Sequence, residues 1–202
     1  MSDKKIKFVD GQMYEYEIYN FVDSYSDVLA QKTEPFDFNN PPVPPRYLAV
    51  SLIETMVQNR GIGLAANQVG LPYRVFVMGA QNVAFACFNP EILETEGEET
   101  VHEGCLSFPG LYLKVKRPFK IKVRYTEMNG NTKDVMFDGL TARIFQHELD
   151  HLNGVKFTSL VGPAALDIAK QKVKKNLKKM GDVVSYWFLR GFYPLLFRDV
   201  IR

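Results

Sequence analysis

The segment QHELDHLNG, residues 146–154, contains two histidines with the spacing H-E-x-x-H. On a helix, His147 and His151 lie about one turn apart, so both imidazoles point to the same side and can bind one metal ion. Two neutral histidines do not complete such a site, because a hydrolytic zinc-type centre usually takes three protein ligands and keeps one position for water. The identity of the third ligand therefore decides the chemistry.

Candidates for the third ligand lie on both sides of this segment. Zinc peptidases with this motif take a Glu or a His downstream, but no histidine or glutamate follows His151 here. The downstream aspartates, on a lysine-rich segment or close to the C-terminal end, are Asp167, Asp182 and Asp199. Upstream, HEGCLSFPG offers His102 and Cys105. Because a thiolate binds a borderline-soft cation strongly and adds the negative charge that two imidazoles lack, we infer that Cys105 is the third ligand.

The chain around these residues predicts short strands and a central helix. Apolar residues recur at helical spacing from Tyr47 to Asn59, and this helix should end in a left-handed cap at Gly61. YRVFVMG and NVAFACFN are typical of a hairpin, and YLKVK, FKIKVRY and KDVMFDG of further short strands. The metal-binding helix is expected from about Gly139 to Leu152, ending at Asn153-Gly154. We therefore predict an α+β fold, with mostly antiparallel strands around the metal-binding helix and an added C-terminal helical segment.

Three segments of the chain differ in composition. Residues 1–45 are rich in Asp, Asn, Tyr and Pro and end in FNNPPVPPRY, so we expect a divergent segment that wraps or links. Residues 46–160 form the expected catalytic domain. Residues 161–202 should form a basic amphipathic helix from Pro163, closed by Gly181, and an aromatic tail. The tail is shorter than the ~20 residues that span a bilayer, and we expect part of it to pack on the body of the protein or on a second subunit.

Length and composition are those of a globular protein. The 202 residues are 46% apolar and 24% charged, and the net charge of +2 is too small to indicate nucleic acid or a membrane as the main partner. The N-terminus MSDKKIKFVDGQ lacks the apolar stretch of a signal peptide, so we expect a cytoplasmic location. In a reducing cytosol Cys87 and Cys105 should stay unpaired, and Cys87, inside the apolar run VAFACF, should serve packing.

Three motifs follow one another along the chain: GIGLAANQ at residues 61–68, EGCLS at residues 103–107 and QHELDHLNG at residues 146–154. In these motifs the sequence resembles the peptide deformylases, over about residues 45–160. The resemblance implies a metal-dependent hydrolase that removes the N-formyl group from the initiator methionine of nascent proteins and releases formate. Residues 1–44 lack the family's initial apolar strand, Pro-Asp turn and Arg-containing segment.

The resemblance also implies how residues share the reaction. It implies one divalent ion, Fe²⁺, with Zn²⁺, Ni²⁺ or Co²⁺ as occupants after purification, and the ligands would be Cys105, His147 and His151. Glu148, not itself a ligand, would take a proton from water and return it to the leaving nitrogen. The Gln68 amide and the backbone N–H of Leu106 would stabilise the oxyanion. Asp150 would not bind the metal itself but would help to orient one of its ligands.

For the substrate, the resemblance implies a peptide that pairs with the chain like an added strand, which Gly61 and Gly63 would permit. The methionine side chain would lie in an apolar pocket near Ile62, Val101, Leu140 and Ile144, with Arg143 close to its rim. Together with Gly104, the implied substrate-binding residues are Gly61, Ile62, Gly63, Val101, Leu140, Arg143 and Ile144. Glu103 and Arg117 match a charged pair that braces the metal loop.

Two other classes of function stay open from the sequence. The first is a ribosome-binding protein on a deformylase fold, with secondary or no catalysis, whose lysine-rich helix docks on ribosomal RNA. The complete ligand set and the intact Glu148 argue against such a loss of activity. The second is a zinc peptidase that cuts internal peptide bonds, which the missing downstream ligand disfavours. The expected partners are therefore N-formylmethionyl nascent peptides and the ribosome, with no membrane span.

Overall fold

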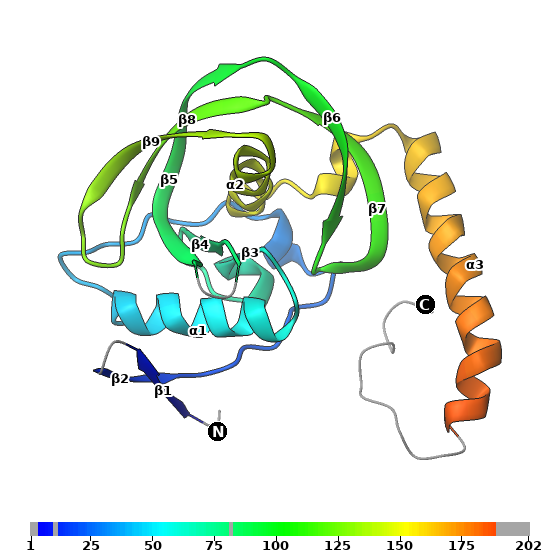
Figure 1. Cartoon of the computed structure of the whole chain (residues 1–202), viewed down its shortest axis with the longest axis horizontal. Helices are drawn as coiled ribbons and strands as arrows, with labels where there is room; N and C mark the ends of the chain where they lie inside the picture. Colours follow the sequence, from blue (N-terminus) through cyan, green and yellow to red (C-terminus); the bar gives the residue numbers. More distant parts are fainter. Residues whose placement is uncertain (1–3, 10–11, 81–82, 189–202) are drawn as a thin grey trace.

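The computed structural model describes residues 4–9, 12–80 and 83–188. Helix α2 (Gly139–Leu152) lies near the centre, and long curved strands surround it (Figure 1). Within the described residues, the named strands pair in antiparallel fashion. The predicted α+β fold is therefore confirmed.

Two sheets shape the body around α2. The larger has five strands in the order β3-β4-β5-β8-β9. Its strands are β3 (Gly63–Ala65), β4 (Val75–Met78), β5 (Phe85–Glu96), β8 (Lys120–Thr126) and β9 (Thr132–Asp138). The smaller sheet pairs β6 (Glu99–Cys105) with β7 (Phe108–Arg117). Cys105 is thus the last residue of a strand.

The larger sheet supports α2 through apolar packing. All residues of β4 are buried, and buried residues alternate with more exposed ones along β8, as expected when one face of a strand packs. Phe145 of α2 packs edge-to-face on Phe76 of β4, with 5.0 Å between the ring centroids. This contact fixes the helix that presents His147 and His151.

Helix α2 begins and ends where the sequence indicates. Gly139 and Gly154 have positive φ angles of 50° and 74°, a conformation that glycine adopts without strain. A Cβ at Gly154 would also overlap the carbonyl group of Ala30, in the short 3₁₀ helix Asp27–Ala30. The Asn153-Gly154 pair therefore ends the helix and lets the N-terminal segment approach it.

Helix α1 (Pro45–Gln58) begins two residues earlier than expected, because proline fits the first turn of a helix, where its missing N–H is not needed. The residue with left-handed backbone after α1 is Arg60, with φ 56°, so the expected cap at Gly61 is wrong. Gly61 matters for space instead, since a Cβ there would lie 2.6 Å from Cδ1 of Leu106 and that side chain would have to shift. The glycine thus marks a close approach between two motifs.

Residues 1–45 include a hairpin that we did not predict. Strands β1 (Lys5–Val9) and β2 (Gln12–Tyr16) pair below α1 (Figure 1). The backbone N–H groups of Glu17 and Tyr19 then donate to hydroxyls of α1, on Ser51 and Thr55. The sequence signal was the Asp-Gly pair between alternating residues, which is typical of a hairpin turn.

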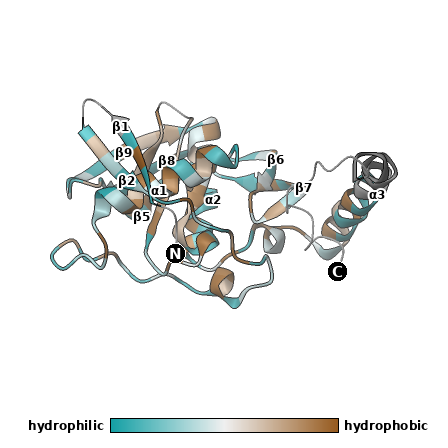
Figure 2. Ribbon diagram, turned by 90° about the horizontal axis from the view of Figure 1, so that it is seen from below, coloured by the Kyte–Doolittle hydropathy of each residue, from teal (hydrophilic) through white to brown (hydrophobic). Residues whose placement is uncertain are grey.

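Helix α3 (Pro163–Phe188) extends along one side of the body, and Figure 2 shows it set apart from the central strands. Its contacts to the body come from Leu166, Ala169 and Val173. The expected end at Gly181 is wrong, because the helix continues beyond it. One glycine costs only ~1 kcal/mol in a helix interior and does not stop a helix by itself. Most of the aromatic tail, residues 189–202, lies outside the described residues.

Among the described helices, none is long and apolar enough to cross a membrane.

Candidate active site

The three expected metal ligands lie together between α2 and the end of β6. Their ligand atoms are all within 4.8 Å of one another, and Sγ of Cys105 is 3.2 Å from Nε2 of His151. A single ion can therefore reach all three atoms at the usual distances of about 2.0–2.3 Å. The helix supplies His147 and His151 from one side, and the strand supplies the sulfur.

The electrostatics of this cluster fit a divalent cation. Burial holds the pKa of His151 well below its ordinary value, so this ring is neutral and keeps a lone pair for a metal. Burial also lowers the pKa of His147, but hydrogen bonds to the Cys105 sulfur and the Glu103 carboxylate outweigh burial and raise it to about 10. A position that attracts a proton in this way also attracts a metal ion, which competes for the same lone pair.

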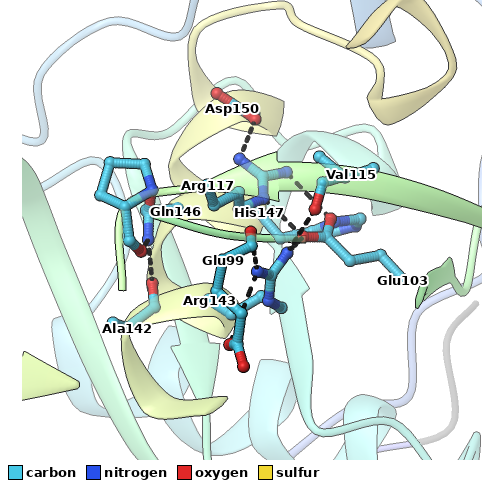
Figure 3. A network of polar contacts seen from close by, with 10 residues as sticks. Glu99, Glu103, Val115, Arg117, Ala142, Arg143, Gln146, His147 and Asp150 are labelled. Atoms are coloured by element: carbon cyan, nitrogen blue, oxygen red, sulfur yellow. Dashed lines mark hydrogen bonds and ion pairs between the residues drawn. The ribbon is translucent and has the colours of Figure 1, made fainter. Parts of the chain in front are cut away.

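Behind His147, a buried network of charges fixes the ring (Figure 3). Oε2 of Glu103 lies 3.0 Å from Nδ1 of His147, which leaves Nε2 to face the other two ligands. Arg117 donates to both oxygens of Glu103, at 2.6 and 3.0 Å, and to Asp150 at 2.7 Å. Burial raises the pKa of Glu103, but hydrogen bonds from His147 and Arg117 outweigh it and lower the pKa to about 2. Asp150 is therefore linked to His147 through two intermediate side chains.

Arg143, which the resemblance places close to the rim of the methionine pocket, belongs to this network. Its guanidinium donates to Oε1 of Glu103 at 2.6 Å and to the carbonyls of Val115 and Glu99 at 3.0 and 2.8 Å (Figure 3). The Arg143 side chain is only 6% exposed. Because it precedes His147 by four residues on α2, it reaches the same carboxylate. Arg143 thus joins α2 to both strands of the smaller sheet.

Glu148 is enclosed beside the ligand cluster. Its Oε2 atom is buried and has no hydrogen-bond partner among the described residues. Burial raises the pKa of this carboxyl to about 7. A methyl group on Gly63 would overlap the carboxylate, so this glycine provides the space that Glu148 occupies. A carboxyl with a pKa near neutrality and a free oxygen is suited to proton transfer.

The amide of Gln68 is held in one orientation. Its Oε1 accepts a hydrogen bond from the N–H of Ala65 at 2.8 Å, and its Nε2 donates to Oγ of Ser107 at 3.0 Å. The same nitrogen lies 3.6 Å from Sγ of Cys105. The donor side of the amide thus faces the ligand cluster, as an oxyanion donor requires. We did not predict Ser107, although it lies inside the EGCLS motif.

A cleft of about 1040 Å³ opens over these groups. Its walls come from residues 21–24, 58–63 and 104–112, and its base includes Gln68, His147 and Glu148. The implied substrate and oxyanion residues that line it are Gly61, Ile62, Gly63, Gly104 and Leu106. Those that do not line it are Val101, Leu140, Arg143 and Ile144.

The four residues that do not line the cleft differ in their surroundings. The side chain of Leu140 is 65% exposed at the start of α2, and that of Val101 is 38% exposed. Ile144 packs against the apolar core between α2 and the larger sheet. The wall at residues 21–24 was not predicted. It is joined to the site by the N–H of Val22, which donates to the carbonyl of Gln68 at 3.0 Å.

Comparisons with known sequences agree with this geometry. The family model described as polypeptide deformylase matches residues 17–165, which extends the resemblance well upstream of residue 45. A peptide deformylase of Thermotoga petrophila is 46% identical over 123 residues, which cover 60% of this chain and 75% of that protein. Peptide deformylase 1 of Clostridium perfringens is 44% identical over 133 residues, which cover 65% of this chain and 89% of that protein.

Solved structures are similar over most of the chain. A peptide deformylase from Synechococcus elongatus in complex with actinonin gives a TM-score of 0.70 at 36% identity, and the match covers 76% of this chain and 85% of that one. The Thermotoga maritima peptide deformylase gives a TM-score of 0.66 at 39% identity, covering 73% of this chain and 99% of that one. The chain belongs to the polypeptide deformylase family and is a hydrolase that uses a divalent metal to remove the formyl group from nascent peptides.

Proposed function

We propose that Cys105, His147 and His151 hold the metal ion of this hydrolase and that Glu148 transfers the proton. The observation that carries the proposal is the buried Glu148 carboxylate, which has one free oxygen beside three metal-binding atoms. A divalent ion held there supplies a nucleophile by lowering the pKa of water and polarises a carbonyl oxygen. We take the physiological ion to be Fe²⁺, since the family resemblance implies iron and imidazole suits it.

Hydrolysis of a formamide requires one proton to leave the attacking water and one to reach the departing amine. Oε2 of Glu148 accepts the first proton, because a pKa of about 7 lets this carboxyl both take and return a proton near neutral pH. The C–N bond then breaks, and Glu148 gives the proton to the nitrogen. Formate and a free N-terminal amine leave. Nε2 of Gln68 and the backbone N–H of Leu106 donate hydrogen bonds to the oxygen that develops negative charge.

The substrate peptide pairs with β3 in this proposal. In the described part of the chain β3 is an edge strand with β4 as its only neighbour in the sheet, and its first residue, Gly63, lines the cleft where a peptide could add as a strand. Gly61 and Gly63 bring no side chains into this approach. Ile62, which is 50% exposed and lines the cleft, offers an apolar contact to the methionine side chain.

Formate release from formyl-Met-Ala-Ser tests the assignment. Glu148→Gln should keep its metal and lose turnover by about 10²–10⁴-fold, because the ligands remain and the proton transfer does not. Glu98→Gln, at an exposed carboxylate between β5 and β6, is the matched control. A near-wild-type rate of Glu148→Gln would contradict the proposal. Cleavage of unformylated Met-Ala-Ser would indicate a peptidase, and no formate from the wild type would indicate a protein without this catalysis.

The choice of Fe²⁺ needs a separate measurement. The metal-free protein should be loaded under anaerobic conditions with Fe²⁺, Zn²⁺, Ni²⁺ or Co²⁺ in turn, and its turnover and metal content compared with those of protein isolated anaerobically. Iron as the bound metal of the active isolated protein would support the proposal. Zinc as the bound metal at full activity would contradict it.

We further propose that residues 161–202 bring the enzyme to the ribosome, separately from the catalytic domain at residues 46–160. Lys170, Lys174 and Lys175 are exposed on α3, and lysines that neutralise phosphates give binding that falls steeply with salt. Lys170→Glu with Lys174→Glu should reduce co-sedimentation with ribosomes at low salt and leave formate release from the tripeptide unchanged. Unchanged co-sedimentation would make this side of α3 an ordinary solvated surface.

A further inference from the structure

A basic groove adjoins the active-site cleft, between the β6–β7 sheet and α3. Its volume is about 530 Å³, and its walls include Lys114 and Lys116 of β7 and Lys172 of α3. Tyr112 lines both this groove and the active-site cleft. The two hollows therefore meet at one side chain, which is 65% exposed.

The strands lead from the reaction centre into the groove. From Leu111 onward, the side chains of β7 alternate between buried and exposed, and the exposed ones are Tyr112, Lys114 and Lys116. Their partners on β6 are Gly104, His102 and Thr100. Gly104 precedes Cys105 and lines the cleft, whereas His102 and Thr100 line the groove. At ~3.3 Å per residue, this face extends about 13 Å outward from Gly104, the length of roughly four extended residues.

The groove combines positive charge with apolar contact area. No acidic side chain lines it, and of its three lysines only Lys116 forms an ion pair among the described residues, with Glu98. Its apolar walls include Leu160 and Ile168, whose side chains are 42% and 68% exposed. Such a surface is complementary to an extended peptide in which acidic and apolar side chains alternate.

We propose that this groove binds the part of the nascent chain several residues beyond the formylmethionine, and that it favours acidic segments there. The inference rests on the proposed function, which places the formyl group at Glu148 and sends the rest of the peptide out of the cleft. The chain then passes Tyr112 and lies along β7 and α3. The lysines contact its carboxylates, and the apolar walls contact the side chains between them.

Formate release from three peptides tests the proposal. The first is formyl-Met-Ala-Ser, and the others extend it by six residues that are identical except for three glutamates or three lysines from the fifth residue onward. In about 50 mM salt, kcat/KM for the glutamate peptide should exceed that for the lysine peptide about three- to tenfold. Exposed charge pairs are weak individually and screened by salt, so the difference should largely disappear in about 0.5 M salt.

Matched variants locate the effect in the groove. Lys114→Glu with Lys172→Glu should abolish or reverse the preference, whereas Lys170→Glu with Lys174→Glu adds the same charge on α3 outside the groove and should preserve it. Tripeptide turnover should be unchanged in both. If the wild type cleaves the tripeptide but shows no charge preference, the groove proposal fails and the proposed function stands. No cleavage of the tripeptide would overturn both. A preference that survives the groove variants, with loss of ribosome binding, would assign the groove to RNA instead.

Discussion

Replacement of Arg143 by methionine should strongly destabilise the protein. Arg117 and Arg143 both pair with the buried Glu103 carboxylate, and Arg117 also pairs with Asp150. Methionine would remove one of the two guanidinium partners of Glu103. It would also remove the 2.6 Å hydrogen bond to Glu103 and the donors to two backbone carbonyls of the smaller sheet. Removal of one partner of a buried ion pair costs about 3–5 kcal/mol.

The remaining contacts place the expected loss near the lower end of that range. Glu103 would keep its two hydrogen bonds from Arg117 and its contact with His147. We therefore expect a loss of about 3 kcal/mol in the free energy of unfolding. For a chain of this size, each kcal/mol lowers Tm by ~2–4 °C, so Tm should fall by about 6–12 °C.

The assay is urea unfolding in the presence of a chelator, because metal that binds only the folded state would add its own stabilisation. Arg124→Met is the matched control. Arg124 pairs with Asp134 at 2.7 and 2.8 Å, but both side chains are well exposed, and this variant should lose less than about 1 kcal/mol. Wild-type stability of Arg143→Met, or equal losses in the two variants, would refute the argument that the buried Arg143–Glu103 pair is important for stability.

Three other changes test separate parts of the site. Gly63→Ala should lower kcat by about 100-fold or more with metal retained, because the methyl group would displace the Glu148 carboxylate. The control is Gly162→Ala, where an added Cβ meets nothing within 4 Å, and it should leave kcat unchanged in the same assay. Cys105→Ser should lose metal on dialysis, since a neutral hydroxyl replaces a thiolate, and full metal content by mass spectrometry would show that the sulfur is not a ligand. Cys87 should resist maleimide until the protein is unfolded, because burial encloses its thiol and raises its pKa. Labelling of Cys87 in the folded protein at the rate of an exposed thiol would show that this thiol is accessible to solvent.

Local geometry explains which parts could be predicted from the sequence. The ends of α2 follow from glycines whose positive φ angles terminate a helix. The approach of His147 and His151 to each other follows from their spacing of four residues. Cys105 could be selected by its chemistry, and the structure places it within 4.8 Å of both histidine ligand atoms. Each of these inferences uses one short segment or one chemical property of a side chain.

Arg143 shows why other parts of the site could not be predicted. The resemblance implied a place close to the rim of the methionine pocket, but the direction of a long side chain depends on which groups the opposite strands present to it. Those strands present the Glu103 carboxylate and two carbonyl groups, which satisfy the guanidinium inside the protein. The available signal in the sequence was the spacing of four residues between Arg143 and His147, which places both on one face of α2. The direction of the Arg143 side chain follows from this spacing only once Glu103 is known to lie opposite both residues.

The glycines of the GIGLAANQ motif were predictable in one respect and not in another. Their importance could be predicted, because glycine is needed where another group approaches the backbone closely. The group that approaches each glycine could not be predicted, since its identity depends on packing between segments that are distant in the sequence. The sequence suggested the substrate backbone, whereas the structure shows the Glu148 carboxylate against Gly63 and the Leu106 side chain against Gly61. In the proposed mechanism Gly63 therefore serves both substrate pairing and proton transfer, because a side chain there would overlap the Glu148 carboxylate whether or not a peptide is bound. For this reason Gly63→Ala should impair kcat even with saturating substrate, while loss of backbone pairing alone would raise KM.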